Sequence, residues 1–211
     1  MKNFDWGTLF GMALQTVPEP RKVARDVFAY PAPRRALWLM LALLLVLMTF
    51  LAVISSILAP VDPAEVAAIL GDDEMAPVYA SPIITGMVQA TTSVAMVWGV
   101  YWIGRKAGGT GSFDQALLTV IWLHFVLLIL QFGILTLGLF APGLALLLTI
   151  MSFVMTFWLL SHFVAEMHGF RSAGSVFAGI MMVLLVMAVV LSILLAMFGI
   201  GAMVDTGPGG A

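Results

Sequence analysis

Five long apolar stretches constrain this sequence more than any other feature. They cover residues 36–59, 82–104, 115–139, 144–165 and 175–200. A helix needs about 20 apolar residues to cross the hydrocarbon core of a bilayer, and each stretch is long enough. Only 9% of the residues are charged, whereas soluble domains carry about 25%. We therefore predict an all-α fold, a polytopic transmembrane bundle of five spans with lipid as its main solvent.

The third and fourth spans are separated by four residues only: Phe140, Ala141, Pro142 and Gly143. Such a short connection predicts an antiparallel hairpin. A single long buried helix is the alternative, but proline and glycine in the connection disfavour it. Upstream of the third span, Ser112 and Gln115 have the spacing of a capping box, which predicts a helix start at this point.

The basic residues predict the orientation of the chain in the membrane. In a five-span topology all nine fall on one side: Lys2, Arg21, Lys22, Arg25, Arg34, Arg35, Arg105, Lys106 and Arg171. The opposite side has acidic residues instead: Asp62, Glu65, Asp72, Asp73, Glu74 and Asp205. Because Lys and Arg concentrate in cytoplasmic loops, we expect the N-terminus inside and the C-terminus outside.

Residues 1–35 are expected to form a cytoplasmic segment before the bundle of residues 36–200. An apolar piece over 4–17 is followed by an amphipathic basic piece over 21–30, a pattern typical of interfacial helices. Its basic residues, with those at the entry to the first span, are Arg21, Lys22, Arg25, Arg34 and Arg35. Two interpretations stay open, a collar on the anionic membrane surface and a docking platform for a partner protein. Across the membrane we expect a short helix over 63–70, and a disordered tail over 201–211.

Ionisable and polar groups within spans are the usual candidates for function in a membrane protein. His124 and Gln131 lie seven residues apart and share a helix face, which suits either an interhelical hydrogen bond or an ion path. His162 and Glu166 lie four apart, with His168 just beyond, so imidazole and carboxylate share a face as metal ligands would. The sequence contains no cysteine and no His-Glu-x-x-His pattern. We expect no cofactor, no metal and no catalytic set.

Two motifs resemble known family features. Residues 106–116, Lys106 to Ala116, form a glycine-rich loop with a phenylalanine that opens a span. Glu166, Met167, His168 and Gly169 form an acidic-x-His-Gly turn before the last span. Together with the aromatic, proline and basic residues that lead into the first span, they resemble the bacterial branch of the Yip1-domain family.

The resemblance implies a five-span membrane protein without enzymatic activity. Eukaryotic members of the family bind prenylated small GTPases in vesicle traffic. This sequence has neither their long N-terminal domain nor their Asp-Leu-Tyr-Gly-Pro motif, so we do not expect that partner here.

The function expected from the sequence is that of a non-enzymatic scaffold or an accessory subunit of a membrane complex in the bacterial inner membrane. Its expected partners are membrane lipids and a membrane protein or a second copy of the chain, with no nucleic acid. The row of His124 and Gln131 supports a second hypothesis, a small-solute or metal-ion permease. A third, an intramembrane metal-dependent enzyme, would depend on His162 and Glu166.

Overall fold

The computed structural model describes residues 6–58, 60, 64 and 81–197, and this part of the chain holds helices and no strand. The helices are α1 (Trp6–Gln15), α2 (Pro20–Phe28), α3 (Arg34–Leu58), α6 (Pro82–Lys106), α7 (Phe113–Phe140), α8 (Pro142–His168) and α9 (Ala173–Met197). The predicted all-α fold is confirmed. Three predicted features lie outside the described residues. They are the helix over 63–70, apart from Ala64, the six acidic residues of the opposite side, and the tail over 201–211.

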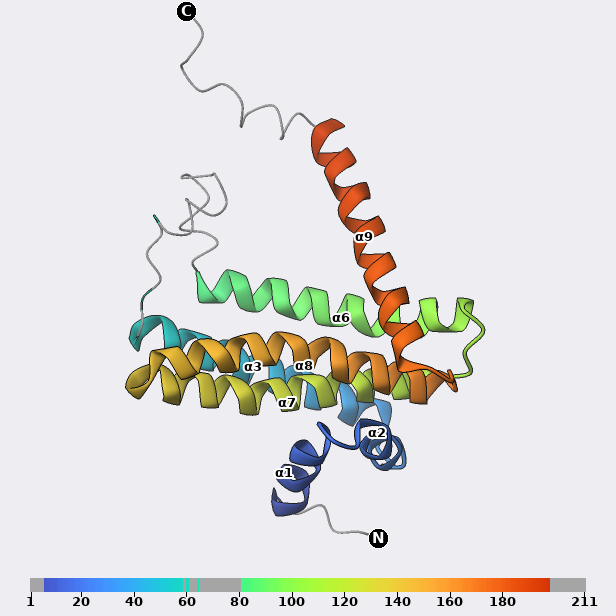
Figure 1. Cartoon of the computed structure of the whole chain (residues 1–211), viewed down its shortest axis with the longest axis horizontal. Helices are drawn as coiled ribbons and strands as arrows, with labels where there is room; N and C mark the ends of the chain where they lie inside the picture. Colours follow the sequence, from blue (N-terminus) through green and yellow to red (C-terminus); the bar gives the residue numbers. More distant parts are fainter. Residues whose placement is uncertain (1–5, 59, 61–63, 65–80, 198–211) are drawn as a thin grey trace, which may run out of the picture.

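Five of these helices, α3, α6, α7, α8 and α9, are long and apolar enough to cross a membrane. They coincide with the five apolar stretches of the sequence, with ends shifted by a few residues. Figure 1 shows α3, α6, α7 and α8 running side by side. The prediction of five membrane-spanning helices is therefore confirmed.

The hairpin between the third and fourth spans is also confirmed. α7 ends at Phe140 and α8 begins at Pro142, so only Ala141 separates the two helices. Proline at the first helical position needs no backbone donor and cannot continue the preceding helix. At the other end of α7, the backbone N–H of Gln115 donates to Ser112 Oγ over 3.2 Å. The Ser112 N–H donates to Gln115 Oε1 over 2.9 Å, which completes the predicted capping box.

The tightly packed core lies at one end of the bundle, which we call the basic end because Arg34, Arg105 and Arg171 all lie there. On α7 the buried side chains fall between Ala116 and Val126. On α8 most of them follow Met155. Towards the α7–α8 turn α8 is mainly exposed and α7 is half-buried or exposed, so lipid is expected to cover them there.

The last helix, α9, stands apart from the other four long helices. None of the residues in its most apolar stretch is buried, and Figure 1 shows it leaving the bundle at a steep angle. Its first turns contact α8, where the Phe177 and Phe157 rings meet edge to face at 6.2 Å. Almost all of its surface is therefore available to lipid.

Candidate functional site

The two motifs of the sequence meet at the basic end. The turn at the end of α8 packs into the glycine-rich loop between α6 and α7, although 57 residues separate His168 from Gly111. The imidazole of His168 is the centre of this contact and is only 2% exposed. We refer to His168 and the three glycines around it, Gly104, Gly109 and Gly111, as the histidine cradle.

Both nitrogens of His168 are bonded to backbone groups. Nε2 lies 3.1 Å from the carbonyl oxygen of Val100 and, since a carbonyl only accepts, it must carry the proton. Nδ1 accepts the Gly111 N–H over 3.2 Å. The backbone adds a third bond, from Thr110 N–H to His168 O at 3.3 Å, and the Phe170 ring stacks on the imidazole at 5.5 Å. A neutral imidazole therefore joins α6, the loop and α8.

The glycines of the cradle are required by close approach. A Cβ atom on Gly104 would stand 2.1 Å from His168 Nε2, and one on Gly109 would stand 2.3 Å from Nδ1. At Gly111 the nearest atom would be Met167 Cγ at 2.7 Å. Real Cβ atoms do not come this close to neighbours, because cores are packed at contact distance. A larger residue at Gly104 or Gly109 must displace the imidazole, and one at Gly111 must displace Met167.

Gly169 ends α8 and turns the chain away from the cradle. Its φ of 72° lies in the left-handed region, where glycine has no steric penalty. The Phe170 N–H donates to Ala165 O over 2.8 Å, which satisfies a carbonyl of the last helical turn. The glycine after the histidine thus sets the direction in which the chain leaves towards α9.

The amphipathic helix α2 is fastened beside the cradle. Its apolar face is buried, with Val23 1% and Val27 5% exposed, and it packs on α7 and α8. At its edge Arg25 forms an ion pair with Glu166 of α8 at 3.2 Å. Arg21 donates to the carbonyl oxygens of Phe170 and Arg171, over 3.2 and 3.1 Å. Protein therefore covers the apolar face of α2, which was expected from the sequence to lie on the membrane surface.

The other predicted docking residues differ in their contacts. Arg34 pairs with Asp114 at 2.6 Å, which joins the start of α3 to the start of α7. Lys22 pairs with Glu19 of the preceding turn, and this hydrogen bond raises the pKa of the lysine above its usual value. Arg35 is exposed and forms no ion pair or hydrogen bond within the described part of the chain. Lys22 and Arg35 are thus the two predicted docking residues that do not join helices.

Reversing the charge of Arg25 should loosen α2. The Arg25→Glu variant places two carboxylates together and is expected to lower the free energy of unfolding by about 1 kcal/mol, because the Arg25 side chain is 63% exposed and water screens the pair. The swap Arg25→Glu with Glu166→Arg should recover most of the loss. Thermal unfolding in one detergent measures both, and Lys22→Glu, which breaks a pair within α2 only, is the control. A swap as unstable as the single variant would contradict the pairing.

His124 is buried between α7 and α6. Its Nδ1 lies 2.8 Å from Val120 O, so this nitrogen carries the proton, and Nε2 lies 2.9 Å from Ser93 Oγ of α6. The Ser93 hydroxyl is also 2.6 Å from Gln89 O. Since a hydroxyl has one proton, it serves either the imidazole or this carbonyl. Nδ1 is thus bonded within α7, and only Nε2, through Ser93, joins α7 to α6.

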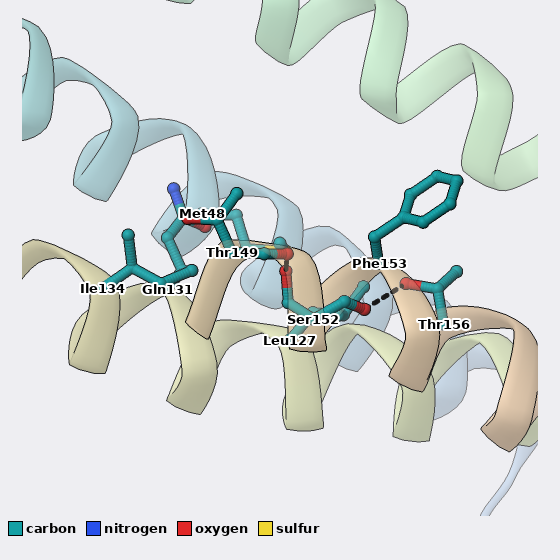
Figure 2. A pocket seen from close by; sticks show the side chains of 8 residues that line it. All are labelled: Met48, Leu127, Gln131, Ile134, Thr149, Ser152, Phe153 and Thr156. Carbon is teal, nitrogen blue, oxygen red and sulfur yellow. Dashed lines mark hydrogen bonds between the residues drawn. The ribbon is translucent and has the colours of Figure 1, made fainter. Parts of the chain in front are cut away.

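Gln131 does not continue the polar row that begins at His124. It lines a groove of about 380 Å³ on the side of the bundle away from the basic end, where the α8 hydroxyls lie in line (Figure 2). The lining residues are Met48, Leu127, Gln131, Ile134, Thr149, Ser152, Phe153 and Thr156. The hydroxyls of Thr149, Ser152 and Thr156 donate to carbonyls of their own helix. His124 is not part of the groove. His124 and Gln131, which share a face of α7, therefore lie in separate environments.

His162 and Glu166 share a face of α8 but have different partners. His162 Nδ1 lies 2.7 Å from Trp158 O, and its ring contacts the Trp158 ring at 4.2 Å. Glu166 is paired with Arg25. Among the described residues no three His, Asp or Glu side chains are grouped as metal ligands would be. His162 therefore contacts Trp158 within α8, and Glu166 helps to attach α2.

The cradle itself was not predicted as a unit. The sequence singled out His168 and the glycine-rich loop, but as separate features. The signal that could have joined them is the glycine spacing over Gly104, Gly109 and Gly111, because so many small residues around one turn indicate close approach by another side chain.

These features define a multi-pass helical membrane protein, with five helices long and apolar enough to cross a bilayer. The chain belongs to the Yip1-domain family, whose family model matches residues 14–194. The match runs from the end of α1 into α9 and includes the histidine cradle. No curated protein and no solved structure matches the chain.

Proposed function

We propose that this Yip1-domain protein is a non-enzymatic scaffold or accessory subunit of a membrane complex. We further propose that it lies in the bacterial cytoplasmic membrane with the basic end inside. The segregation of Lys and Arg supports the orientation, because such residues stay cytoplasmic. A partner, either another membrane protein or a second copy of the chain, would bind at the basic end.

The observation that carries this proposal is the construction of the basic end. Three of the predicted docking residues, Arg21, Arg25 and Arg34, hold α2 and α3 against the bundle. Lys22 and Arg35 remain exposed, on helices α2 and α3 that these contacts hold in place. A preformed surface loses little conformational entropy on binding, which favours a docking role.

The permease hypothesis has less support. A path for a polar solute requires polar groups that continue along a cavity through the membrane. His124 is buried with both nitrogens bonded, while Gln131 opens to a separate groove. The enzyme hypothesis loses its motivation as well, since Glu166 is paired with Arg25.

The test is recovery of a partner with the full-length protein. We would isolate the protein from native membranes in nanodiscs and identify stoichiometric companions by mass spectrometry. In the double variant Lys22→Glu with Arg35→Glu, we expect the companion to be lost, because the charge on the docking surface is reversed. Seven of the nine basic residues remain to hold the orientation.

The matched control keeps both charges, as Lys22→Arg with Arg35→Lys. It should retain the companion at the wild-type level. A wild-type preparation that contains only monomer would contradict the scaffold role, and a companion that survives charge reversal would contradict the docking surface. A dimer lost on reversal would identify a second copy as the partner.

A further inference from the structure

The first helix carries an apolar face that the rest of the chain leaves uncovered. α1 and the two residues after it contain no Asp, Glu, Lys or Arg. Phe10, Leu14 and Val17 recur at helical spacing and are 50%, 62% and 55% exposed. A helix in water would place charged side chains on such a face.

A neighbouring face at the end of α1 is fixed to the bundle at a known position along α7. Trp122 Nε1 donates to Thr16 Oγ1 over 3.0 Å. Thr16 is fully buried, and Ala13 belongs to the same core cluster as Trp122. This hydrogen bond attaches the end of α1 to the interior of a membrane span, since Trp122 lies nine residues beyond the first residue of α7.

The depth follows from helix geometry. Trp122 is nine residues beyond Phe113, the first residue of α7, which corresponds to about 14 Å at 1.5 Å per residue. The hydrocarbon core is about 30 Å thick, so Thr16 lies at the depth of the acyl chains rather than at the membrane surface. Figure 1 agrees, because along the bundle axis α1 lies farther from the α8–α9 turn than α2 does.

We propose that α1 is inserted in the bilayer and that its face of Phe10, Leu14 and Val17 binds the acyl chains of one leaflet, the leaflet at the basic end. After α1 the chain returns to the surface at α2, where Arg21 and Lys22 lie. Because α1 does not cross to the other leaflet, it adds area to one leaflet only. This lipid contact is independent of the docking surface at Lys22 and Arg35.

The absence of cysteine from the sequence makes the test direct. The full-length protein would carry one nitroxide label at Leu14→Cys in vesicles of phosphatidylethanolamine and phosphatidylglycerol. Val154→Cys is the lipid control, since Val154 is 52% exposed near the middle of α8. Ala107→Cys, in the exposed loop after α6, is the water control. Collisions with oxygen report lipid, and collisions with a soluble nickel chelate report water.

We expect the ratio of oxygen to nickel collisions at Leu14 to match that at Val154 and to exceed that at Ala107 several-fold. A ratio like that of Ala107 would overturn the proposal, because α1 would then lie in water. Protection from both reagents would also overturn it, since a second copy or another protein would cover the face. Leu14 is exposed, so the substitution should not disturb folding.

A second variant tests the role of the hydrogen bond. Trp122→Phe keeps an aromatic ring but removes the donor to Thr16. The mobility of the label at Leu14 should rise in this background, while the label at Val154 should not change. Equal mobility at Leu14 with and without the indole N–H would show that Thr16 does not hold α1 at this depth.

Discussion

Alanine at Gly104 is expected to expel His168 from its cradle and to destabilise the basic end of the bundle. The new Cβ would stand 2.1 Å from Nε2 of the imidazole. The ring has little room to move aside, because Gly109 also lies against it, where a Cβ atom would stand 2.3 Å from Nδ1. Expulsion breaks the bonds to Val100 O and the Gly111 N–H. With the lost packing, we expect the free energy of unfolding to fall by roughly 2–4 kcal/mol.

Gly138→Ala is the matched control. Gly138 also lies inside a spanning helix, and a Cβ atom there would meet nothing within 4 Å. Alanine is a better helix former than glycine by about 0.5–1 kcal/mol, so this variant should be neutral or slightly more stable. The thermal unfolding midpoint, measured in one detergent, should therefore fall for Gly104→Ala and should stay or rise slightly for Gly138→Ala. Similar shifts for the two variants would show that Gly104 has no special role.

A double variant tests whether the effect acts through the imidazole. His168→Ala removes the ring and should by itself lower the unfolding midpoint. If alanine at Gly104 acts by expelling this ring, adding it to His168→Ala should cost little more, because neighbouring sites that share an interaction are not additive. If the destabilisations of the two single variants add fully, the new Cβ at position 104 clashes with a group other than the imidazole.

The helices and their order could be predicted because the information is local. Each span is encoded by its own apolar run, and the start of α7 by a capping box of two residues, Ser112 and Gln115. The hairpin follows from Pro142, which cannot continue α7. None of these predictions requires knowledge of a distant residue.

The contacts of the site could not be predicted, because they depend on how each helix is rotated and on what faces it. Hydropathy places His124 inside a span but does not show that Ser93 of α6 faces it. The apolar face of α2 could have been covered by lipid or by protein, and its pattern is the same in both cases. Glu166 shares a face with His162, yet it pairs with Arg25, 141 residues away.

Alanine at Phe163 should release α2 from the bundle. Phe163 is completely buried on α8, and its ring meets the Phe28 ring of α2 edge to face at 5.9 Å. Truncation of a buried phenylalanine costs about 3–5 kcal/mol, from lost transfer energy and the cavity that remains. The ion pair of Arg25 with Glu166 is screened by water on its arginine side and cannot replace this contribution. Without the aromatic contact, α2 should therefore leave its place on α7 and α8 for part of the time.

Limited trypsin digestion measures this release, because α2 contains Arg21, Lys22 and Arg25. Cleavage at these residues should be several-fold faster in Phe163→Ala than in the wild type. Lys106, the exposed last residue of α6, is an internal reference. Faster cleavage in α2 with an unchanged rate at Lys106 indicates local release, whereas a rise at both indicates loss of the whole basic end.

Phe153→Ala removes the same side chain from the same helix at a position that is 66% exposed. Lipid rather than protein is expected to surround this ring, so no cavity forms and the cleavage rate in α2 should stay at the wild-type value. Faster cleavage in both variants would mean that α2 responds to any change in α8. No change in either would mean that Phe28 and Phe163 contribute little, and that Arg21 and Arg25 suffice to hold the helix.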